Sequence, residues 1–313
     1  MMSDDKTIKV IFFGDMVGRP GRFALRDFLQ NTKNTAPSFI IANVENASHG
    51  FGLTEKNYNE ISEYGVNCMT SGNHIWDKKE IFNYIDRADK LIRPINYPNG
   101  TAGCGSRIFE LANGVKIGVI NVLGRVFMAP VDSQWVVVKD EIERIKKVTP
   151  IVIVDFHAEA TAEKICFARF CSELGVSAFF GTHTHVQTAD EQIINNMGYI
   201  TDAGFCGTKE SVIGMEYETS LHRFTTVVPE RYDVADGNAV QVNAVEVEIN
   251  PTSGHTVAIR RIFCYVDKEK KEAENEKWFA YSHPLFRRSI FAGKDCRHRN
   301  WCRLTSNCFD RPR

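Results

Sequence analysis

Two histidine-bearing segments near the middle of the chain hold side chains suited to metal chemistry. Val154 to Glu159 reads VDFHAE, and Gly181 to His185 reads GTHTH. His183 and His185 are two residues apart, so in an extended backbone their imidazoles project to the same side and can reach one metal ion or two adjacent ones. A polar loop would explain an isolated His-x-His pair equally well. A metal site therefore needs support from other segments.

Three further segments place ligand-type side chains directly after an apolar run. These are Gly14-Asp15, Asn43-Val44-Glu45-Asn46 and Gly72-Asn73-His74. Carboxylates, carboxamides and imidazoles all bind divalent metals, and a glutamate can bridge two of them. Each segment alone is also compatible with a helix cap or a polar turn. Their recurrence beside the two histidine segments favours one shared metal centre.

The apolar runs that precede these residues are predicted to be buried strands. They comprise Ile8 to Phe13, Phe39 to Ala42, Val66 to Met69, Ile151 to Val154 and Val176 to Phe180. Runs of β-branched and aromatic residues without polar alternation are typical of strands buried on both faces. Open α/β sheets build their sites at the carboxyl ends of such strands, so we expect the polar segments to meet there.

Helices and hairpins are predicted around these strands. Helical spacing or capping signals mark Arg22 to Leu29, a helix starting at Thr54, and Asp132 to Lys147. Hairpins are indicated by Ser106 to Leu111 with Lys116 to Val122, and by Val240 to Ile249 with Val257 to Val266. In the strand from Val240 to Ile249 the alternation slips at Ala244-Val245, which we interpret as a β-bulge. Strands alternating with helices indicate an α/β fold.

Composition narrows the class of protein. The chain has 313 residues with 43% apolar content and a formal net charge of −1, which suits one large domain or two small ones and argues against a general nucleic-acid or membrane surface. Met1 to Lys6 is polar, and no run of about eighteen apolar residues occurs, so we expect a cytoplasmic protein with no membrane contact. The cysteines form no CxxC pair, which indicates reduced thiols rather than a structural zinc site.

In this order the segments resemble the calcineurin-like metallophosphoesterases, and more closely their YmdB-like family. The family patterns GDxVGxxGR, ENxxxGxG, GNHxWD, VDFHAExTxEK and GTHTHVQTADE occur here at Gly14 to Arg22, Glu45 to Gly52, Gly72 to Asp77, Val154 to Lys164 and Gly181 to Glu191. The similarity runs from about Ile8 to Ile262. Two departures from the general superfamily pattern are characteristic of the YmdB-like family: Asp-x-His and Gly-Asp-x-x-Asp are replaced by Asp15-Met16-Val17 and Val44-Glu45-Asn46.

The resemblance implies a calcineurin-like four-layer α/β/β/α sandwich with two mixed β-sheets. We predict that residues 1–266 form this domain. Residues 267–313 lie outside the resemblance and combine basic and aromatic residues with Cys296, Cys302, Cys308 and His298. Such a segment could bind single-stranded nucleic acid or a metal, but no ligand pair has zinc-finger spacing. We therefore leave it as an unassigned C-terminal extension.

Carried over residue by residue, the resemblance implies two metal ions that share Glu45. The first ion would be held by Asp15, Glu45, Asn46 and His185, and the second would be completed by Asn73, His157 and His183. Two cations roughly 3.5–4 Å apart can share a hydroxide and clamp the phosphate oxygens for in-line attack. His74 would stay off the metals and, when protonated, act as general acid by giving its proton to the leaving alkoxide.

The resemblance also implies the substrate and self-association, whereas the kind of metal is inferred from the ligand types. The two ions would be divalent or mixed-valence; imidazole and carboxylate ligands suit iron or manganese, and zinc or magnesium is also compatible. The implied activity is that of a phosphodiesterase, with 2′,3′-cyclic nucleotides as substrates and self-association into a homo-oligomer. The alternative is a metal-dependent RNA-binding or regulatory protein in which turnover is secondary, and the basic C-terminal extension would favour it.

Several neighbouring polar residues are candidates for lesser roles. Glu159 and Glu163 are predicted in the first turn of a helix, where Glu159 could also orient a metal ligand. His49 could contact substrate, although a solvated loop position is the simpler expectation. Guanidinium groups pair with phosphate in bidentate fashion, and the candidates for this role, each also compatible with an ordinary surface charge, are Arg19, Arg22 and Arg125.

Overall fold

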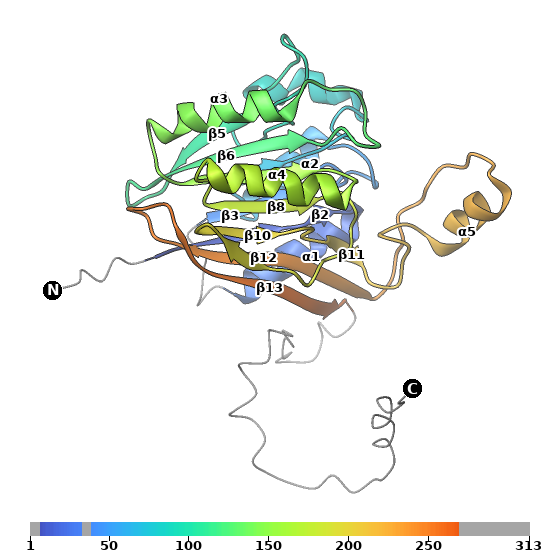
Figure 1. Ribbon diagram of the computed structural model, residues 1–313. Helices are drawn as coiled ribbons and strands as arrows, with labels where there is room; N and C mark the ends of the chain where they lie inside the picture. Colours follow the sequence, from blue (N-terminus) through green and yellow to red (C-terminus); the bar gives the residue numbers. More distant parts are fainter. Residues whose placement is uncertain (1–6, 33–38, 269–313) are drawn as a thin grey trace, which may run out of the picture. The chain divides into compact units, whose positions relative to one another are not determined.

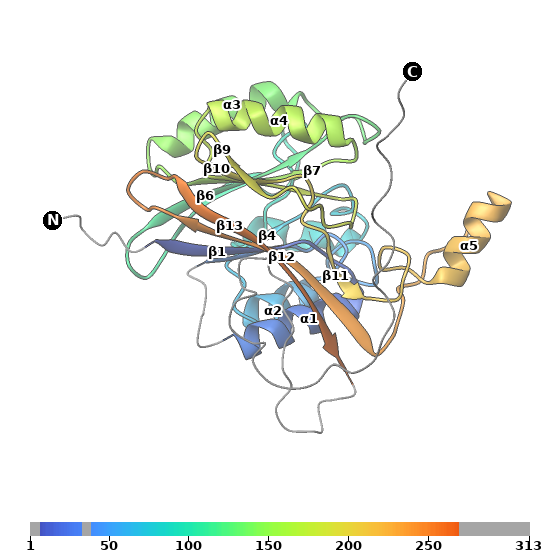
Figure 2. The same ribbon diagram turned by 60° about the horizontal axis from the view of Figure 1, so that its bottom comes forward.

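Two β-sheets lie face to face between two layers of helices in the computed structural model of the chain (Figures 1 and 2). The structure describes residues 7–32 and 39–268. The four-layer α/β/β/α sandwich with mixed sheets is therefore confirmed. The predicted extension at 267–313 lies almost wholly outside the described residues, and its separation from the domain stays a prediction.

The first sheet has seven strands in the order β2-β11-β12-β1-β3-β4, with β13 paired to β12. Its members are β1 (Ile8–Phe13), β2 (Asp15–Met16), β3 (Phe39–Asn43), β4 (Cys68–Thr70), β11 (Phe205–Thr208), β12 (Ala239–Ile249) and β13 (Thr256–Asp267). β1, β3 and β4 run parallel, whereas β12 is antiparallel to β1. The carboxyl ends of β1, β3 and β4 therefore share one edge.

The second sheet has six strands in the order β5-β6-β7-β8-β10-β9. Its members are β5 (Ser106–Glu110), β6 (Lys116–Leu123), β7 (Val152–His157), β8 (Ala178–Thr182), β9 (Gln192–Ile194) and β10 (Met197–Ile200). The central strands β6, β7, β8 and β10 are parallel, and β5 and β9 are antiparallel edges. The predicted hairpin of Ser106 to Val122 is β5-β6.

Four of the five helices of the described residues, the first two and the next two along the chain, cover the outer faces of the first and second sheet, and the fifth projects away from the sandwich (Figures 1 and 2). The helices are α1 (Gly18–Asn31), α2 (Glu55–Glu63), α3 (Gln134–Lys146), α4 (Thr161–Glu173) and α5 (Tyr217–Thr226), with 3-10 turns η2 (Lys79–Asn83) and η3 (Ile85–Arg87). Thr54 caps α2 as expected, because its side chain accepts a hydrogen bond from the backbone of Asn57 at 3.2 Å. Among the described residues no helix is long and apolar enough to cross a membrane.

Three hydrophobic clusters hold the layers together. One lies between α1, α2 and the first sheet and includes Leu25 and Phe28. A second lies between the two sheets, where the rings of Phe12 and Phe180 stack with centroids 4.6 Å apart. The third joins α3 and α4 to the second sheet around Phe167. Because both faces of each sheet are covered, the central strands can consist almost entirely of apolar residues.

The phase slip in β12 has a different cause from the one predicted. Val242 and Ala244 pack in the cluster under α1, whereas Val245 and Val247 pack in the cluster between the sheets. Pairing with both neighbouring strands runs through Ala244 and Val245 without interruption, and the irregularity with β13 lies between Glu248 and Ile249. The bulge predicted at Ala244-Val245 is therefore wrong. The strand is buried on both faces, so apolar residues occupy consecutive positions.

At the carboxyl ends of β1 and β8 the backbone is packed too closely for a side chain. A Cβ added at Gly181 would lie 1.8 Å from the carbonyl oxygen of Thr201, and one added at Gly14 would lie 2.1 Å from that of Gly204. Both obstacles are backbone atoms and cannot rotate away. These two glycines let segments that carry polar residues approach one another.

We predict that Gly181→Ala lowers the free energy of unfolding by about 1–3 kcal/mol, because backbone must move to admit the methyl group. Urea denaturation followed by circular dichroism measures this. The matched control is Gly237→Ala, where the nearest atom to an added Cβ is the Thr208 methyl at 3.0 Å. Equal stability of the two variants would contradict the close packing at Gly181.

Candidate metal centre

All the predicted ligands come together where strands of both sheets end. Asp15 lies in β2 directly after β1, while Glu45 and Asn46 follow β3. The others come from the ends of β4, β7 and β8: Asn73, His157, His183 and His185. Most of these side chains are buried, and only Asn73 and His183 are partly exposed. The centre thus draws on segments more than a hundred residues apart in the sequence.

The Nε2 atom of His157 lies at the centre of one group of ligand atoms. It lies 3.0 Å from Asn73 Oδ1, 3.1 Å from Glu45 Oε1 and 3.0 Å from His183 Nδ1. The ligand atoms of Glu45, His157 and His183 all lie within 4.8 Å of one another. The Nε2 of His183 is 3.0 Å from the carboxylate of Glu159, to which it can donate a hydrogen bond. The Nδ1 of His183 then carries a lone pair that faces His157 and Glu45. Four atoms able to bind a cation therefore surround one point.

A second group lies beside the first. The Nδ2 of Asn46 is 3.1 Å from Glu45 Oε1 and 3.3 Å from His185 Nε2, and Asp15 Oδ1 is 3.8 Å from the same His185 nitrogen. Asp15 Oδ1 and Asn46 Oδ1 are buried and have no hydrogen-bond partner among the described residues. Buried acceptors without a donor are costly, and a cation would satisfy them. The residues present therefore fit a second metal ion.

The backbone and neighbouring side chains fix how these ligands point. The amide of His183 donates to Asp15 Oδ2 at 3.0 Å, and the amide of His74 donates to Glu45 Oε2 at 3.0 Å. The Nδ1 of His185 donates to the Ile213 carbonyl at 2.8 Å, which leaves its Nε2 as the ligand atom. Such outer partners set the tautomer and orientation of a metal-binding histidine.

His157 is oriented by a short chain of hydrogen bonds. Thr182 Oγ1 donates to Asp155 Oδ1 at 2.7 Å and lies 3.0 Å from His157 Nδ1, from which it can accept. This arrangement leaves Nε2 of His157 facing the other ligands. The role of Asp155 and Thr182 had no signal in the sequence beyond their place in the two histidine segments.

Gly72 makes room for the first group of ligands. A Cβ at this position would lie 2.3 Å from Glu45 Oε2 and 2.4 Å from His157 Nε2. The sequence predicted a glycine in a tight turn here. In the structure the backbone at Gly72 lies directly against the ligand atoms, so a side chain at this position would displace those atoms.

The loop that carries His183 and His185 is not an extended strand. Both residues have positive φ, 102° and 62°, and the loop lies beyond the end of β8. The premise that an extended backbone aims both imidazoles to one side is therefore wrong, although both still reach the centre. Positive φ in residues other than glycine is strained, so the surroundings must hold it in place.

A buried ion pair supplies part of that support. Lys164 on α4 lies 2.7 Å from the carboxylate of Asp202, and both side chains are about 1% exposed. The same carboxylate oxygen accepts from the backbone and the hydroxyl of Thr184 at 3.1 and 2.7 Å. The pair thus ties α4 to the histidine loop. Sequence reasoning missed it, because nothing local links a helical lysine to an aspartate 38 residues later.

His74 stands apart from the ligand groups. Its Nδ1 is 2.9 Å from Asp77 Oδ2, and its ring packs edge-on against Phe51 at 4.8 Å. The ring lines a cavity of about 320 Å³ that also exposes Glu45, Asn46 and both loop histidines. Asp77 was not singled out from the sequence; its spacing of three residues from His74 was the available signal.

The lesser candidates have mostly structural surroundings. Glu159 does orient His183, whereas the Glu163 carboxylate accepts from the backbone of Arg125 and Val126 at 3.0 and 3.1 Å and so anchors a loop. Arg22 pairs with Glu60 at 2.9 Å. Arg19 and His49 line a different cavity of about 810 Å³.

The charged side chains of the centre shift one another's pKa values. Burial alone would raise the pKa of Glu45, but His157 lowers it to about 2. Burial alone would lower the pKa of His157, but Glu45, Asp15 and Asp155 raise it to about 9. The pKa of His183 falls to about 3 through burial and the nearby charge of His157. A proton on His157 would therefore stabilise the group through its contact with the Glu45 carboxylate.

Comparison with known proteins identifies the family. The family model described as YmdB-like protein matches residues 11–262, most of the chain. The protein belongs to the YmdB-like family. A curated YmdB-like relative from Bacillus subtilis (strain 168), named 2′,3′-cyclic-nucleotide 2′-phosphodiesterase, is 42% identical over 257 residues, which cover 82% of this chain and 96% of that protein.

Two solved structures share the YmdB-like fold. A hypothetical protein from Thermus thermophilus matches with a TM-score of 0.77 and 36% identity, covering 82% of this chain and 99% of that one. A protein from Mycoplasma pneumoniae described as a novel phosphatase matches with a TM-score of 0.77 and 34% identity, covering 86% and 98%. At these identities the similarity extends beyond the fold to the family.

We predict that the metal-free YmdB-like protein loses stability as pH rises from 6.5 to 9. The pKa of His157 is raised from 6.5 to about 9, so its contribution is complete below 6.5 and is lost as pH rises through 9. Thermal melts of chelator-treated protein measure the effect. His157→Asn should flatten the dependence of the melting temperature on pH, whereas the substitution His255→Asn at an exposed position should leave it unchanged. A wild-type melting temperature that is constant over this range would contradict the raised pKa of His157.

Proposed function

We propose that this protein is a binuclear-metal phosphodiesterase that hydrolyses 2′,3′-cyclic nucleotides. The observation that carries the proposal is the pair of adjoining ligand groups, with buried acceptor oxygens on Asp15 and Asn46 that lack hydrogen-bond partners among the described residues. Family membership and the phosphodiesterase and phosphatase names of its relatives make the protein a hydrolase of phosphoric esters. The name of the Bacillus subtilis relative supports the substrate class.

The two groups would hold one ion each. Asp15, Asn46 and His185 would hold the first, Asn73, His157 and His183 the second, and Glu45 would bridge them. Iron or manganese suits these mixed oxygen and nitrogen ligands, with zinc or magnesium as further possibilities. When bound, such ions polarise phosphate oxygens and lower the pKa of an attacking water.

The chain's own residues prepare the site for that chemistry. Glu159 and the Ile213 carbonyl fix the tautomers of His183 and His185, so that neutral nitrogens face the ions. Burial of Asp15 and Glu45 keeps competing water from their oxygens, which strengthens their attraction for a cation. Opposing charge from the ions would replace the proton that His157 carries without them.

His74 is placed to act as general acid. It lines the cavity, is not among the ligand atoms, and its Nδ1 is held by Asp77 at 2.9 Å. The contact with Asp77 favours a proton on Nδ1 and directs Nε2 away from that carboxylate. A proton on Nε2 can then pass to the ester oxygen that leaves, which converts a poor alkoxide leaving group into an alcohol.

Self-association, RNA binding and a cytoplasmic location remain part of the proposal. Self-association is supported by a stripe of exposed apolar residues on one face of α5: Tyr217, Leu221 and Phe224 are 58%, 40% and 72% exposed.

The predicted RNA-binding extension lies outside the described residues. Retention of RNA binding after loss of turnover in His74→Ala would favour the alternative regulatory function.

Metal dependence tests the proposed activity. We predict that the purified protein hydrolyses bis-p-nitrophenyl phosphate and 2′,3′-cyclic AMP, that chelation abolishes both activities, and that Mn²⁺ restores them. His157→Ala should lower kcat/KM at least about 100-fold through loss of a ligand. His255→Ala serves as the control. Hydrolysis that survives chelation, or a fully active His157→Ala variant, would contradict a metal centre at these residues.

The leaving group tests the role of His74. We predict that His74→Ala lowers kcat for 2′,3′-cyclic AMP by about 10²–10⁴-fold, the usual contribution of general acid catalysis. For bis-p-nitrophenyl phosphate the loss should be less than about tenfold, because p-nitrophenolate departs without a proton. Metal content measured in both proteins should be equal. An equal loss on the two substrates would show that His74 is not the acid.

A further inference from the structure

The cavity beside the metal ligands has two chemically different halves. One half consists of the ligands and the groups around them, such as His74 and Glu159. The other half is apolar and is formed by Phe51, Val212, Ile213, Met215, Phe224 and Tyr232. Among the described residues that line this cavity, none is a lysine or an arginine. A ligand that fills it must therefore present a metal-binding group on one side and an uncharged group on the other.

The aromatic side chains of the apolar half are held in place before any ligand arrives. Phe51 lies between Gly50 and Gly52, whose φ values of +87° and +75° give the loop its sharp course. Phe51 and Tyr232 both pack against a buried cluster that includes Met215. Rings fixed in this way lose little freedom when a planar group stacks on them.

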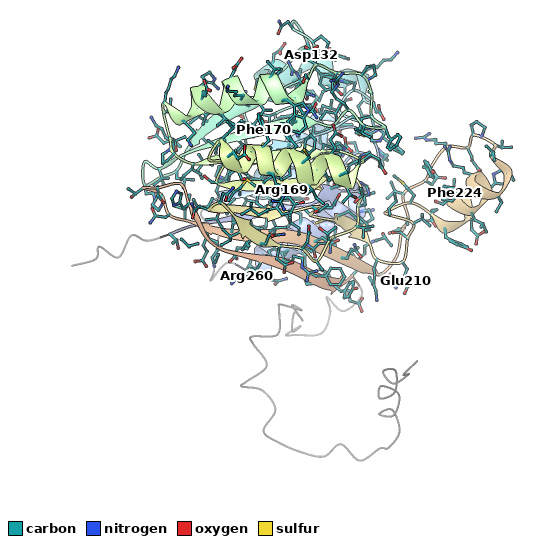
Figure 3. All side chains as sticks on the ribbon, in the orientation of Figure 1. Asp132, Arg169, Phe170, Glu210, Phe224 and Arg260 are labelled. Atoms are coloured by element: carbon teal, nitrogen blue, oxygen red, sulfur yellow. The ribbon has the colours of Figure 1, made fainter. Side chains whose placement is uncertain are left out.

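The apolar half of the cavity adjoins His74, the proposed general acid. The Phe51 ring lies 4.8 Å from the His74 ring and 6.4 Å from the Tyr232 ring. The Arg223 guanidinium lies over the Tyr232 ring at 4.2 Å from its centroid. Phe224 also lines the cavity, and it lies on α5 in the projecting part of the chain (Figure 3). The apolar surface thus extends outward from the place where the leaving oxygen would lie.

We propose that this apolar half is a nucleobase subsite in which the base stacks on Tyr232 and Phe51. The inference rests on the proposed function, because it is the phosphate at the metal ligands that places the nucleoside against this surface. A cavity of about 320 Å³ is of the size that takes a small organic ligand. Without a lysine or arginine in its described lining, it favours a nucleoside cyclic phosphate over a nucleotide that carries an additional phosphate group.

The aliphatic hydroxyl groups in the lining, those of Ser220 and Thr184, are already engaged, which sets the expected base preference. Ser220 Oγ donates to the Glu216 carbonyl at 2.8 Å, and Thr184 Oγ1 donates to Asp202 at 2.7 Å. Recognition through stacking alone tolerates any base, because every base has an aromatic face. The subsite should therefore accept adenine and guanine with similar KM.

The decisive comparison uses two cyclic phosphates, one with a base and one without. For Tyr232→Ala we expect KM for 2′,3′-cyclic AMP to rise about tenfold, the effect of one lost stacking contact, while kcat stays within about twofold. KM for glycerol 1,2-cyclic phosphate should not change. Tyr232→Phe keeps the ring and should match the wild type, and Tyr265→Ala removes an exposed tyrosine of β13 outside the cavity as the control. Equal changes for both substrates, or none for either, would overturn the proposal.

A binding measurement separates failure of the subsite from failure of the proposed activity. Saturation-transfer NMR with adenosine should show saturation of the adenine ring protons in the wild type and clear attenuation in Tyr232→Ala. If the wild type hydrolyses neither cyclic phosphate with Mn²⁺, the proposed activity fails, while this signal still tests the subsite. If both esters are hydrolysed but adenosine gives no signal or the same signal in both proteins, the subsite is wrong.

Discussion

The arrangement of the candidate centre depends on buried acceptor atoms whose lone pairs face one another. Oxygen or nitrogen acceptors of Glu45, Asn73 and His183 surround Nε2 of His157, and only a positive charge, whether a proton or a metal ion, makes that arrangement favourable. The outward-facing atoms of Glu45, His157 and His183 each contact a donor or acceptor that holds them. An arrangement of this kind suits a bound cation.

The two packed sheets make such crowding possible. Parallel strands bring their carboxyl ends to one edge, and the face-to-face contact of Phe12 with Phe180 fixes one sheet on the other. Where the sheets meet at that edge, Gly14, Gly72 and Gly181 let backbone and ligands approach to distances that no side chain would allow. The apolar runs therefore do more than fill the core, because they set the positions of the polar residues that follow them.

The sequence allowed the ligands and the layers to be predicted, because each ligand follows an apolar run and the family patterns are specific. It did not reveal the supports, such as Asp77 beside His74 or Lys164 with Asp202, since a polar residue carries no local sign of a distant partner. The slip at Ala244-Val245 was misinterpreted for a related reason: burial on both faces removes the alternation from which a bulge was inferred. The aromatic side of the cavity was missed because Phe51 and Tyr232 lie in loops without periodicity.

The pair of Lys164 with Asp202 has a consequence for how the centre fails. The lysine belongs to an outer helix and the aspartate holds the loop of His183 and His185, so α4 cannot separate from the second sheet without releasing that loop. Fraying of the helix and loss of the ligand arrangement are thereby joined in one cooperative opening. The stability of the histidine loop is thereby tied to that of the hydrophobic layer beneath α4.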